Sequence, residues 1–332
     1  MKILLTGGAG YVGSIVAQEL EKAGHRLWIV DNFSTSTRAV QEVLSGAAIT
    51  WREGELGDAA FLEDVIGRTA FDACVHLAGS ARVDESMARP ALYYRNNVSA
   101  GLVLLETLVR HGVGSFVFSS TAAVYGAPRT VPIEEDHPKE PTNCYGETKL
   151  AFERMLHWHH LAGGPGYVCL RYFNAAGAAS DASLGERHDP ETHLIPNLLS
   201  SAATGAEVPV FGDDYPTADG TCVRDYVHVE DLARAHRLAL ELLAKERRAL
   251  ALNLGSGDGA SVREVMAAVE RVTKATLRPR IHPRRAGDPP VLVASRRRAE
   301  EVLGWVPQAS SLDHIIESAW RWQKQRSPGK GA

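Results

Sequence analysis

A glycine-rich segment near the amino terminus constrains the fold of this chain more than any other part of its sequence. Residues 6–13 read Thr-Gly-Gly-Ala-Gly-Tyr-Val-Gly. They lie between an apolar run at 2–6 and a segment at 12–23 whose apolar residues recur at helical spacing. Glycines are needed where the chain must turn sharply and a helix must pack closely on a strand. The sequence therefore predicts a strand, a tight turn and a helix in direct succession.

Apolar runs further along the chain predict a doubly wound α/β fold. Short β-branched or apolar runs alternate with helical stretches, as in a parallel Rossmann sheet that is covered on both faces. Strands are predicted at residues 2–6, 26–31, 48–52, 73–78, 116–119 and 167–172. After Asn174 this alternation is lost among small and polar residues, so a smaller α/β substrate-binding lobe is expected to begin there.

The predicted domain borders are interleaved. A run at 224–229, a helical stretch at 230–243 and an apolar run at 251–255 resemble one more unit of the sheet. We therefore expect residues 1–174, with a returning segment at about 223–255, to form the Rossmann domain. The smaller lobe is expected at 175–222 and 256–326, and a tail at 327–332.

Composition and charge argue against several classes of protein. Lys and Arg number 36 against 40 Asp and Glu, for a net charge of −4, without the basic excess of a nucleic-acid-binding protein. The amino-terminal apolar run is too short for a signal peptide, and no run of about eighteen apolar residues follows. The four cysteines have no Cys-x-x-Cys spacing. We expect a cytoplasmic protein with reduced thiols that binds neither nucleic acid nor a membrane.

The glycine turn predicts a site for the pyrophosphate of NAD. The missing side chains leave room for the pyrophosphate, and the following helix offers free amides and a partial positive charge. Asp31 ends the second predicted strand, where a carboxylate can accept hydrogen bonds from the adenosine ribose and repel a 2′-phosphate. NAD is therefore favoured over NADP. The alternatives are a glycine-rich connector without a ligand and an Asp31 that only caps a turn with Asn32.

Tyr145 and Lys149 are candidate catalytic residues. On a helix, residues four apart lie on one face, a single turn from each other. A tyrosine with an ordinary pKa of ~10 becomes a base near neutral pH only if a nearby positive charge stabilises its phenolate. Such a pair also arises by chance. This pair, however, follows a predicted strand that ends in Ser119-Ser120-Thr121, which can present a hydroxyl to the same reacting atom.

In this order, the glycine turn, Asp31, the segment at 119–126 and the Tyr145/Lys149 pair resemble the extended short-chain dehydrogenase/reductase superfamily. Further segments narrow the resemblance to the UDP-glucose 4-epimerase family. They are Arg-Tyr-Phe-Asn at 171–174, His-Leu-Ile-Pro at 193–196, runs at 211–221 and 223–229, and Arg-Arg-Ala-Gly-Asp at 284–288. The stretch Tyr-Pro-Thr-x-Asp-Gly-Thr at 215–221 is distinctive of that family. The resemblance extends from Lys2 to about Trp322.

The resemblance implies interconversion of UDP-galactose and UDP-glucose. Tyr145 would remove the proton of the sugar 4-hydroxyl while NAD⁺ takes the hydride from C4, with Thr121 assisting by hydrogen bonding. The flat 4-keto sugar would then turn over and receive the hydride on its other face. Lys149 would bind the nicotinamide ribose and lower the pKa of Tyr145. A retained NAD, a role in galactose metabolism and a homodimer are also implied.

Two sets of binding residues are implied by the same resemblance. The cofactor-binding residues are Gly7, Gly10, Tyr11, Val12, Gly13, Asp31, Asn32, Glu55, Leu56, Leu77, Ala78, Gly79, Asn97, Ser119, Tyr145, Lys149 and Tyr172. The substrate-binding residues are Thr121, Asn174, His193, Leu194, Phe211, Arg224, Tyr226, Arg285 and Asp288.

Individual roles in the second set follow the family. Arg224 and Arg285 would hold the diphosphate, and Asp288 the uridine ribose. A surface ion pair is the alternative for each arginine. Contacts to the phosphate and uracil region would come from Asn174 and Leu194, and Phe211 would cover one face of the uracil.

The sequence departs from the family at two places in the expected cofactor site. Residues 53–56 read Glu-Gly-Glu-Leu where the family usually has Gly-Asp and an apolar residue, so Glu55 would have to reach the adenine. The loop after the fourth strand offers Arg82 one place later than the family's lysine.

Several alternatives stay open. Leu292, expected at the gate of the sugar pocket, is neither a small residue that admits an N-acetyl group nor a tyrosine that excludes it, so UDP-GlcNAc/GalNAc or a UDP-pentose could be the substrate. A reductase that releases its cofactor and an NAD-binding regulator without chemistry are further alternatives. A 4,6-dehydratase is disfavoured, because that reaction needs an acid and a base at the positions where this chain has alanines, residues 122–123.

No metal is expected, because the histidines at 157, 159 and 160 lack a His-Glu-x-x-His pattern. Cys144 is expected to be a packing thiol, because the sequence places no histidine to activate it.

Overall fold

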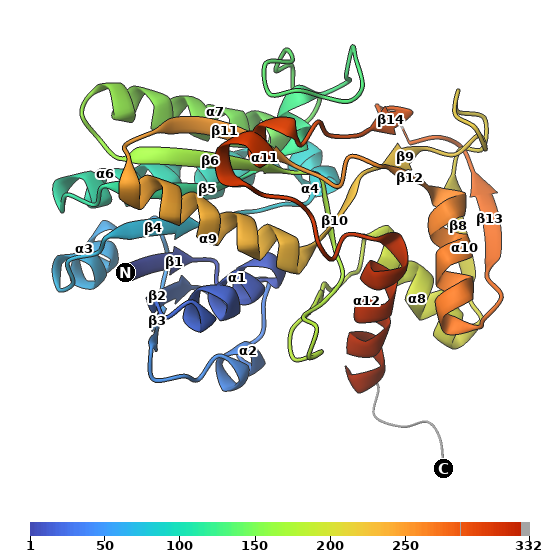
Figure 1. Cartoon of the computed structure of the whole chain (residues 1–332), viewed down its shortest axis with the longest axis horizontal. Helices are drawn as coiled ribbons and strands as arrows, with labels where there is room; N and C mark the ends of the chain where they lie inside the picture. Colours follow the sequence, from blue (N-terminus) through green and yellow to red (C-terminus); the bar gives the residue numbers. More distant parts are fainter. Residues whose placement is uncertain (286, 327–332) are drawn as a thin grey trace.

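The computed structural model describes residues 1–285 and 287–326, so the predicted tail at 327–332 lies outside the described residues. In this described part, seven parallel strands form one sheet in the order β11-β6-β5-β4-β1-β2-β3 (Figure 1). The strands are β1 (Lys2–Thr6), β2 (Arg26–Asp31), β3 (Ile49–Glu53), β4 (Ala73–His76), β5 (Ser115–Thr121), β6 (Gly166–Tyr172) and β11 (Ala249–Leu254). The predicted doubly wound fold is confirmed, and the strand ends differ from the predicted ones by at most two residues.

The strand order reverses at β1, which pairs with β2 on one side and with β4 on the other. Consecutive connections therefore leave β1 and β4 toward opposite faces of the sheet. Sheets of this kind bind ligands in the crevice outside the carboxyl ends of the strands at such a reversal. The glycine turn, which follows β1 directly, lies at that crevice.

Helices cover both faces of the sheet because side chains alternate along the strands. In β1, Ile3 and Leu5 enter a core shared with α1 (Tyr11–Lys22) and α9 (Val229–Lys245). Leu4 enters the opposite core, which it shares with α3 (Ala59–Gly67), α6 (Ala100–Arg110) and α7 (Cys144–Leu161). Shorter elements on these connections are α2 (Ala39–Val43), α4 (Val83–Ala88), α5 (Pro90–Tyr93), the π-helical η1 (Tyr94–Ser99) and the 3₁₀-helical η2 (Ala122–Tyr125).

A smaller lobe lies beyond the carboxyl ends of the strands (Figure 1). Its core joins α8 (Leu194–Thr204), α10 (Val262–Thr273) and α12 (Leu312–Arg326) to the pair formed by β8 (Glu207–Phe211) and β13 (Arg278–His282). Short pairings connect the lobes: β7 (Asn174–Ala176) with β10 (Tyr226–His228), and β9 (Val223–Arg224) with β12 (Ala260–Ser261) and β14 (Val291–Leu292). By contrast, α11 (Arg297–Leu303) packs on α9 and β11. The predicted division into domains stays a prediction.

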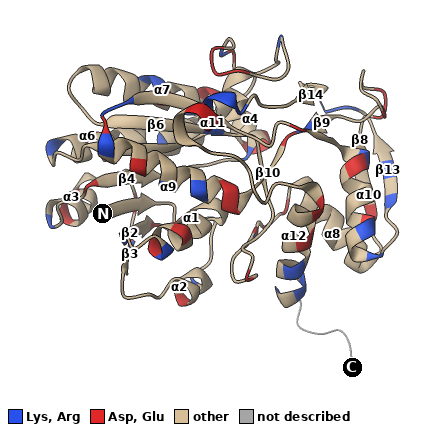
Figure 2. Cartoon of the chain, in the orientation of Figure 1, with Lys and Arg blue, Asp and Glu red and all other residues tan. Residues whose placement is uncertain are grey.

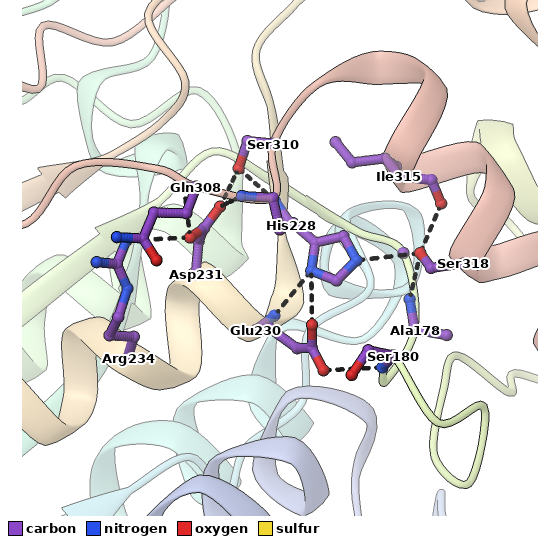
Figure 3. Close-up of polar contacts among 12 residues, drawn as sticks. Ala178, Ser180, His228, Glu230, Asp231, Arg234, Gln308, Ser310, Ile315 and Ser318 are labelled. Carbon is purple, nitrogen blue, oxygen red and sulfur yellow. Dashed lines mark hydrogen bonds and ion pairs between the residues drawn. The ribbon is translucent and has the colours of Figure 1, made fainter.

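The first turn of α9 anchors the segment that leads into α12 (Figure 3). The Asp231 carboxylate accepts three hydrogen bonds from this segment. Their donors are the amides of Gln308 and Ala309, both at 2.8 Å, and the hydroxyl of Ser310, at 2.7 Å. One buried carboxylate on α9 therefore holds the start of a helix that belongs to the smaller lobe.

Acidic and basic residues are interspersed along α9 and α10, and α12 carries acidic residues in its first half and basic residues in its second (Figure 2). This distribution differs from the one-sided basic surface of a typical nucleic-acid-binding protein. Within the described residues, none of the helices is both long and apolar enough to cross a membrane.

Candidate functional site

The glycine turn fits an anionic group at the crevice of the sheet. Gly7 has a φ of +75°, and a Cβ there would overlap the backbone of Ala78. A Cβ on Gly13 would overlap the Gly7 carbonyl oxygen, so glycine at this position lets α1 approach β1 closely. Gly10 is the N-cap of α1 and has no side chain to satisfy the first amides of the helix. These amides suit a phosphate ligand, and the turn therefore fits the pyrophosphate of NAD.

Asp31 supports this turn from the end of β2. One carboxylate oxygen accepts a hydrogen bond from the Ala9 amide at 2.9 Å, and the other accepts one from the Phe33 amide at 2.8 Å. The neighbouring Asn32 donates to both carboxylate oxygens of the exposed Glu55, at 3.1 and 3.2 Å. The structure thus brings Asp31, Asn32 and Glu55 to one end of the crevice. The hydrogen bond from the Phe33 amide also makes Asp31 part of a local turn with Asn32, which was the alternative role expected for it.

Tyr145, Thr121 and Lys149 come together where β5 ends and α7 begins. Lys149 is 4% exposed, and its Nζ donates to the Ser119 carbonyl oxygen at 2.8 Å. The same Nζ lies 5.9 Å from the centre of the Tyr145 ring. Burial lowers the pKa of Lys149 to about 8. Burial also raises the pKa of Tyr145, an effect that hydrogen bonding to Thr121 partly offsets.

Local sequence at the start of α7 produces this arrangement. The Asn143 side chain caps the helix by accepting a hydrogen bond from the Gly146 amide at 2.8 Å. A Cβ on Gly146 would lie 2.5 Å from the Ala123 carbonyl oxygen, so only glycine lets α7 come this close to η2. This close approach positions Tyr145 beside Thr121.

Asn97 braces the loop after β4, on the other side of the crevice. Its Oδ1 accepts a hydrogen bond from the Ser80 amide at 2.8 Å. Its Nδ2 donates to the Ser80 carbonyl oxygen and to the Thr148 hydroxyl, both at 3.0 Å. The loop that it holds against α7 contains the predicted cofactor residues Leu77, Ala78 and Gly79.

The other predicted cofactor residues lie at the ends of elements around the same crevice. Tyr11 and Val12 begin α1, and the Tyr11 hydroxyl donates to the Gly177 carbonyl oxygen at 2.6 Å. Leu56 follows β3. Tyr172 ends β6, where its hydroxyl contacts His236 of α9.

A buried ion pair behind Lys149 is a feature that the sequence analysis missed. Glu153, one helical turn after Lys149, accepts hydrogen bonds from Arg171 at 2.9 and 2.6 Å and from the Ser120 hydroxyl at 2.5 Å. Arg171 also donates to the Tyr125 hydroxyl at 2.8 Å. The four-residue spacing of Lys149 and Glu153 indicates that both lie on one helix face. Nothing in the sequence, however, indicates that Arg171 pairs with Glu153.

Four of the predicted nucleotide-binding residues form two pairwise contacts, Arg224 with Asp288 and Arg285 with Phe211. Arg224 forms an ion pair with Asp288, and its side chain is only 11% exposed, so this is not the surface ion pair offered as the alternative. The Arg285 guanidinium lies 4.1 Å from the centre of the Phe211 ring. Leu292 pairs in register with Arg224. Asn174 pairs in register with Tyr226, next to this group.

Two other residues named from the sequence, His193 and Arg82, have local ion-pair partners. His193 precedes α8, whose first residue is Leu194, and its Nδ1 lies 2.5 Å from Glu186 Oε1. Arg82 pairs with Asp84 at 2.7 Å. Burial raises the pKa of the Cys144 thiol, as expected of a packing residue rather than a nucleophile.

Solved structures of similar proteins match the whole architecture. The UDP-glucose 4-epimerase from Brucella ovis, in complex with NAD, is 44% identical and has a TM-score of 0.92, covering 96% of this chain and 97% of its own. The UDP-glucose 4-epimerase from Bifidobacterium longum, in complex with NAD⁺ and UDP, is 36% identical, also with a TM-score of 0.92, and covers 98% of both chains.

Sequence relatives match along the whole length as well. The UDP-glucose 4-epimerase of Halalkalibacterium halodurans is 46% identical over 332 residues, covering 99% of this chain and 97% of its own. The enzyme of the same name from Streptomyces lividans is 47% identical over 330 residues, with 99% and 98% coverage. A sequence model described as the NAD dependent epimerase/dehydratase family matches residues 3–255. With the glycine turn and the Tyr145/Lys149 pair both inside that match, the chain belongs to the NAD-dependent epimerase/dehydratase family.

Proposed function

We propose that the chain is a UDP-glucose 4-epimerase, which interconverts UDP-glucose and UDP-galactose. The observation that carries this proposal is the meeting of Tyr145, Thr121 and the buried Lys149 at the crevice that also holds the glycine turn. Full-length similarity to enzymes of this name supports the same reaction. The alanines that begin η2 cannot exchange protons, which argues against a dehydratase.

NAD is the cofactor that the site fits. Its pyrophosphate would lie against the turn from Gly7 to Gly13, its adenosine ribose at Asp31 and its nicotinamide ribose at Lys149. Bound NAD supplies a reversible hydride acceptor, which makes oxidation and reduction at the sugar C4 available without net redox change. Further contacts are proposed from Tyr11, Val12, Asn32, Glu55, Leu56, Leu77, Ala78, Gly79, Asn97, Ser119 and Tyr172.

Tyr145 is proposed to take and return the proton of the sugar 4-hydroxyl. Burial alone keeps its phenol protonated, because it raises the pKa. The phenolate therefore needs stabilising groups, and Lys149 provides a positive charge 5.9 Å from the ring centre. Thr121 provides a hydrogen bond to the same phenol. The bond from Lys149 to the Ser119 carbonyl keeps the charge in place while the proton moves.

The UDP half of the substrate is proposed to lie in the smaller lobe. Arg224 and Arg285 would bind the diphosphate, and Asp288 the uridine ribose. Because Arg224 and Asp288 are already paired, substrate binding would replace part of this pair by phosphate contacts. Phe211, Asn174, Tyr226 and Leu194 would contact the uracil and phosphate region, and His193 would do so through its backbone.

A homodimer is proposed from a group of exposed apolar side chains around α7. Trp158 is 69% exposed near the end of α7, and Leu161 ends this helix. Large exposed apolar side chains one turn apart on the same helix suit a surface that a second copy of the chain would cover. A cytoplasmic location is proposed because all four cysteines, which lie in the described part of the chain, are unpaired.

The decisive experiment uses protein purified without added NAD. We expect it to carry bound nucleotide and to convert UDP-galactose to UDP-glucose without added cofactor. Tyr145→Phe should abolish this conversion and keep the nucleotide, whereas the matched change Tyr94→Phe, at an exposed tyrosine of η1, should stay active. Turnover that requires added NAD would favour a cofactor-releasing reductase, and normal turnover by Tyr145→Phe would refute the mechanism.

Substrate range is tested in parallel with UDP-GlcNAc and UDP-xylose. Leu292 is the residue that we expect to limit N-acetylhexosamines, because it lies beside Arg224 and packs against the core of η2 and α7. Leu292→Ala should therefore raise conversion of UDP-GlcNAc relative to UDP-galactose. An unchanged ratio would mean that another residue limits the pocket.

A further inference from the structure

The loop between β7 and α8 gathers four side chains of the kinds that ligate metals. Glu186, His188, Glu191 and His193 each present one ligand atom, and these atoms all lie within 4.8 Å of one another. The loop is irregular, so its ligands follow no helical or strand spacing. These residues form no His-Glu-x-x-His pattern, which is why the sequence predicted no metal.

The distances inside the cluster are those found around a single ion. His188 Nδ1 lies 3.1 Å from Glu186 Oε1 and 3.8 Å from Glu191 Oε2. His193 Nδ1 lies 2.5 Å from Glu186 Oε1 and 3.5 Å from Glu191 Oε1. Tetrahedral bonds of ~2.0–2.1 Å place neighbouring ligand atoms ~3.3 Å apart, in the middle of this range. These separations would have to change by up to about 0.8 Å to complete the coordination.

Burial differs widely within the cluster. The Glu186 side chain is 7% exposed, whereas that of His193 is 55% exposed. The backbone of Glu186 is also fixed, because its carbonyl oxygen accepts a hydrogen bond from Trp322 of α12 at 2.9 Å. A cavity of about 270 Å³ opens beside Glu186, His188 and Glu191. A cation can thus enter from solvent and bind against a fixed, buried carboxylate.

Charge balance allows two states of this cluster. Two carboxylates this close need compensation, either from two protonated imidazoles or from one divalent cation with two neutral imidazoles. Imidazole nitrogens favour zinc-like ions over magnesium or calcium, which prefer oxygen ligands. We propose that Glu186, His188, Glu191 and His193 form a binding site for a divalent transition-metal cation of the Zn²⁺ class.

The position of the loop suggests what such an ion would do. His188 lines a second cavity together with Gly10 and Tyr11 of the glycine turn. At the other end of the loop, His193 leads directly into Leu194 at the start of α8. A bound ion would hold the loop between the proposed cofactor turn and the proposed nucleotide contacts. This consequence rests on the proposed function, but the binding of the ion does not.

The test is a calorimetric titration of untagged, full-length protein that retains its nucleotide and has been dialysed against a chelator. Zn²⁺ should bind one equivalent per chain, and Mg²⁺ should not. His188→Gln and Glu191→Gln should each weaken Zn²⁺ binding by more than about tenfold, the loss that even an outer-shell change can cause. Glu63→Gln is the matched control, because it breaks a separate His–Glu pair with His111 at 2.6 Å and should change nothing.

Two further measurements separate the outcomes. Bound Co²⁺ should show the intense visible bands of a four-coordinate site, and these should disappear in His188→Gln while its thermal unfolding remains cooperative. A His157→Asn/His159→Asn variant tests whether these α7 histidines bind the ion instead. The proposal is overturned if Zn²⁺ does not bind stoichiometrically, if His188→Gln and Glu191→Gln bind normally, or if only the α7 variant loses binding. In the first case the cluster is a pair of imidazolium–carboxylate ion pairs.

Discussion

Replacing Asp231 by alanine tests how firmly α9 holds the smaller lobe. Asp231 is 2% exposed and accepts hydrogen bonds from the amides of Gln308 and Ala309 and from the hydroxyl of Ser310 (Figure 3). It also lies 3.1 Å from the guanidinium of Arg234. Alanine removes every one of these acceptors and leaves the donors in place.

The expected magnitude follows from the donors that lose their acceptor. A buried donor without a partner costs ~1–3 kcal/mol, so the two amides and the hydroxyl set a range of ~3–9 kcal/mol. Gln308 is exposed and Ala309 and Ser310 are half-buried, so water can reach part of this group. We therefore expect the free energy of unfolding to fall by about 3 kcal/mol, at the lower end of that range. In a chain of this size this corresponds to an unfolding midpoint about 4 °C lower.

The assay is thermal unfolding of variants with equal nucleotide content, followed by circular dichroism. Asp313→Ala is the matched control, since Asp313 on α12 forms an exposed ion pair with Arg271 at 2.6 Å. Such a pair contributes ~0–1 kcal/mol, so its loss should lower the midpoint by at most about 1.5 °C. Equal shifts in the two variants would refute the reasoning, because they would show that the buried carboxylate stabilises no more than an exposed one.

The remaining predictions concern the glycine turn, the buried lysine and the exposed helix face. Gly13→Ala should abolish nucleotide retention, because the added Cβ would overlap the Gly7 carbonyl oxygen. The control Gly114→Ala should retain the nucleotide, because no atom lies within 4 Å of a Cβ at that position. Equal nucleotide content of the two variants, measured by absorbance, would contradict this prediction. Activity that needs a charged Lys149 should fall as the pH rises through about 8, and a Lys149→Met variant should lose this limb from its residual pH–rate profile. Trp158→Glu should convert a dimer to monomers in light scattering, because it charges the most exposed of the apolar side chains on α7; an unchanged mass would place any interface elsewhere.

Regular periodicity explains which parts of the fold could be predicted. Buried parallel strands such as β1 and β6 are nearly continuous apolar runs, and α1 carries an apolar stripe, so both leave a clear pattern in the sequence. The glycine turn was predictable for a different reason. The overlaps that a Cβ on Gly7 or Gly13 would cause leave no other residue type at these positions, so the constraint is visible in the sequence itself.

The contacts between distant segments could not be predicted in the same way. Asp231 meets residues that lie 77–79 positions later in the chain, and no periodic pattern links them. The cluster at 186–193 lies on an irregular loop, so its ligands come together through turns rather than through a repeating spacing. The partners of Glu153 depend on the register of β6 beside β5, which the sequence does not specify.

The two halves of the proposed site therefore differ in how they are held. On α7, the first turn is fixed by Gly146 against η2, the next by Lys149 against the Ser119 carbonyl, and the third by Glu153 against Ser120. Successive turns of one helix are thus attached to η2 and to the end of β5, which would keep the proposed reacting groups in place to the accuracy that proton transfer needs. The proposed nucleotide contacts instead come from short strands and loops of the smaller lobe, such as β9 and the loop residues Arg285 and Asp288. Substitutions there can change which sugar nucleotide is bound without disturbing the helix. This separation explains why the Tyr145/Lys149 spacing indicates only a broad superfamily, whereas the stretch at 215–221 points to a narrower one.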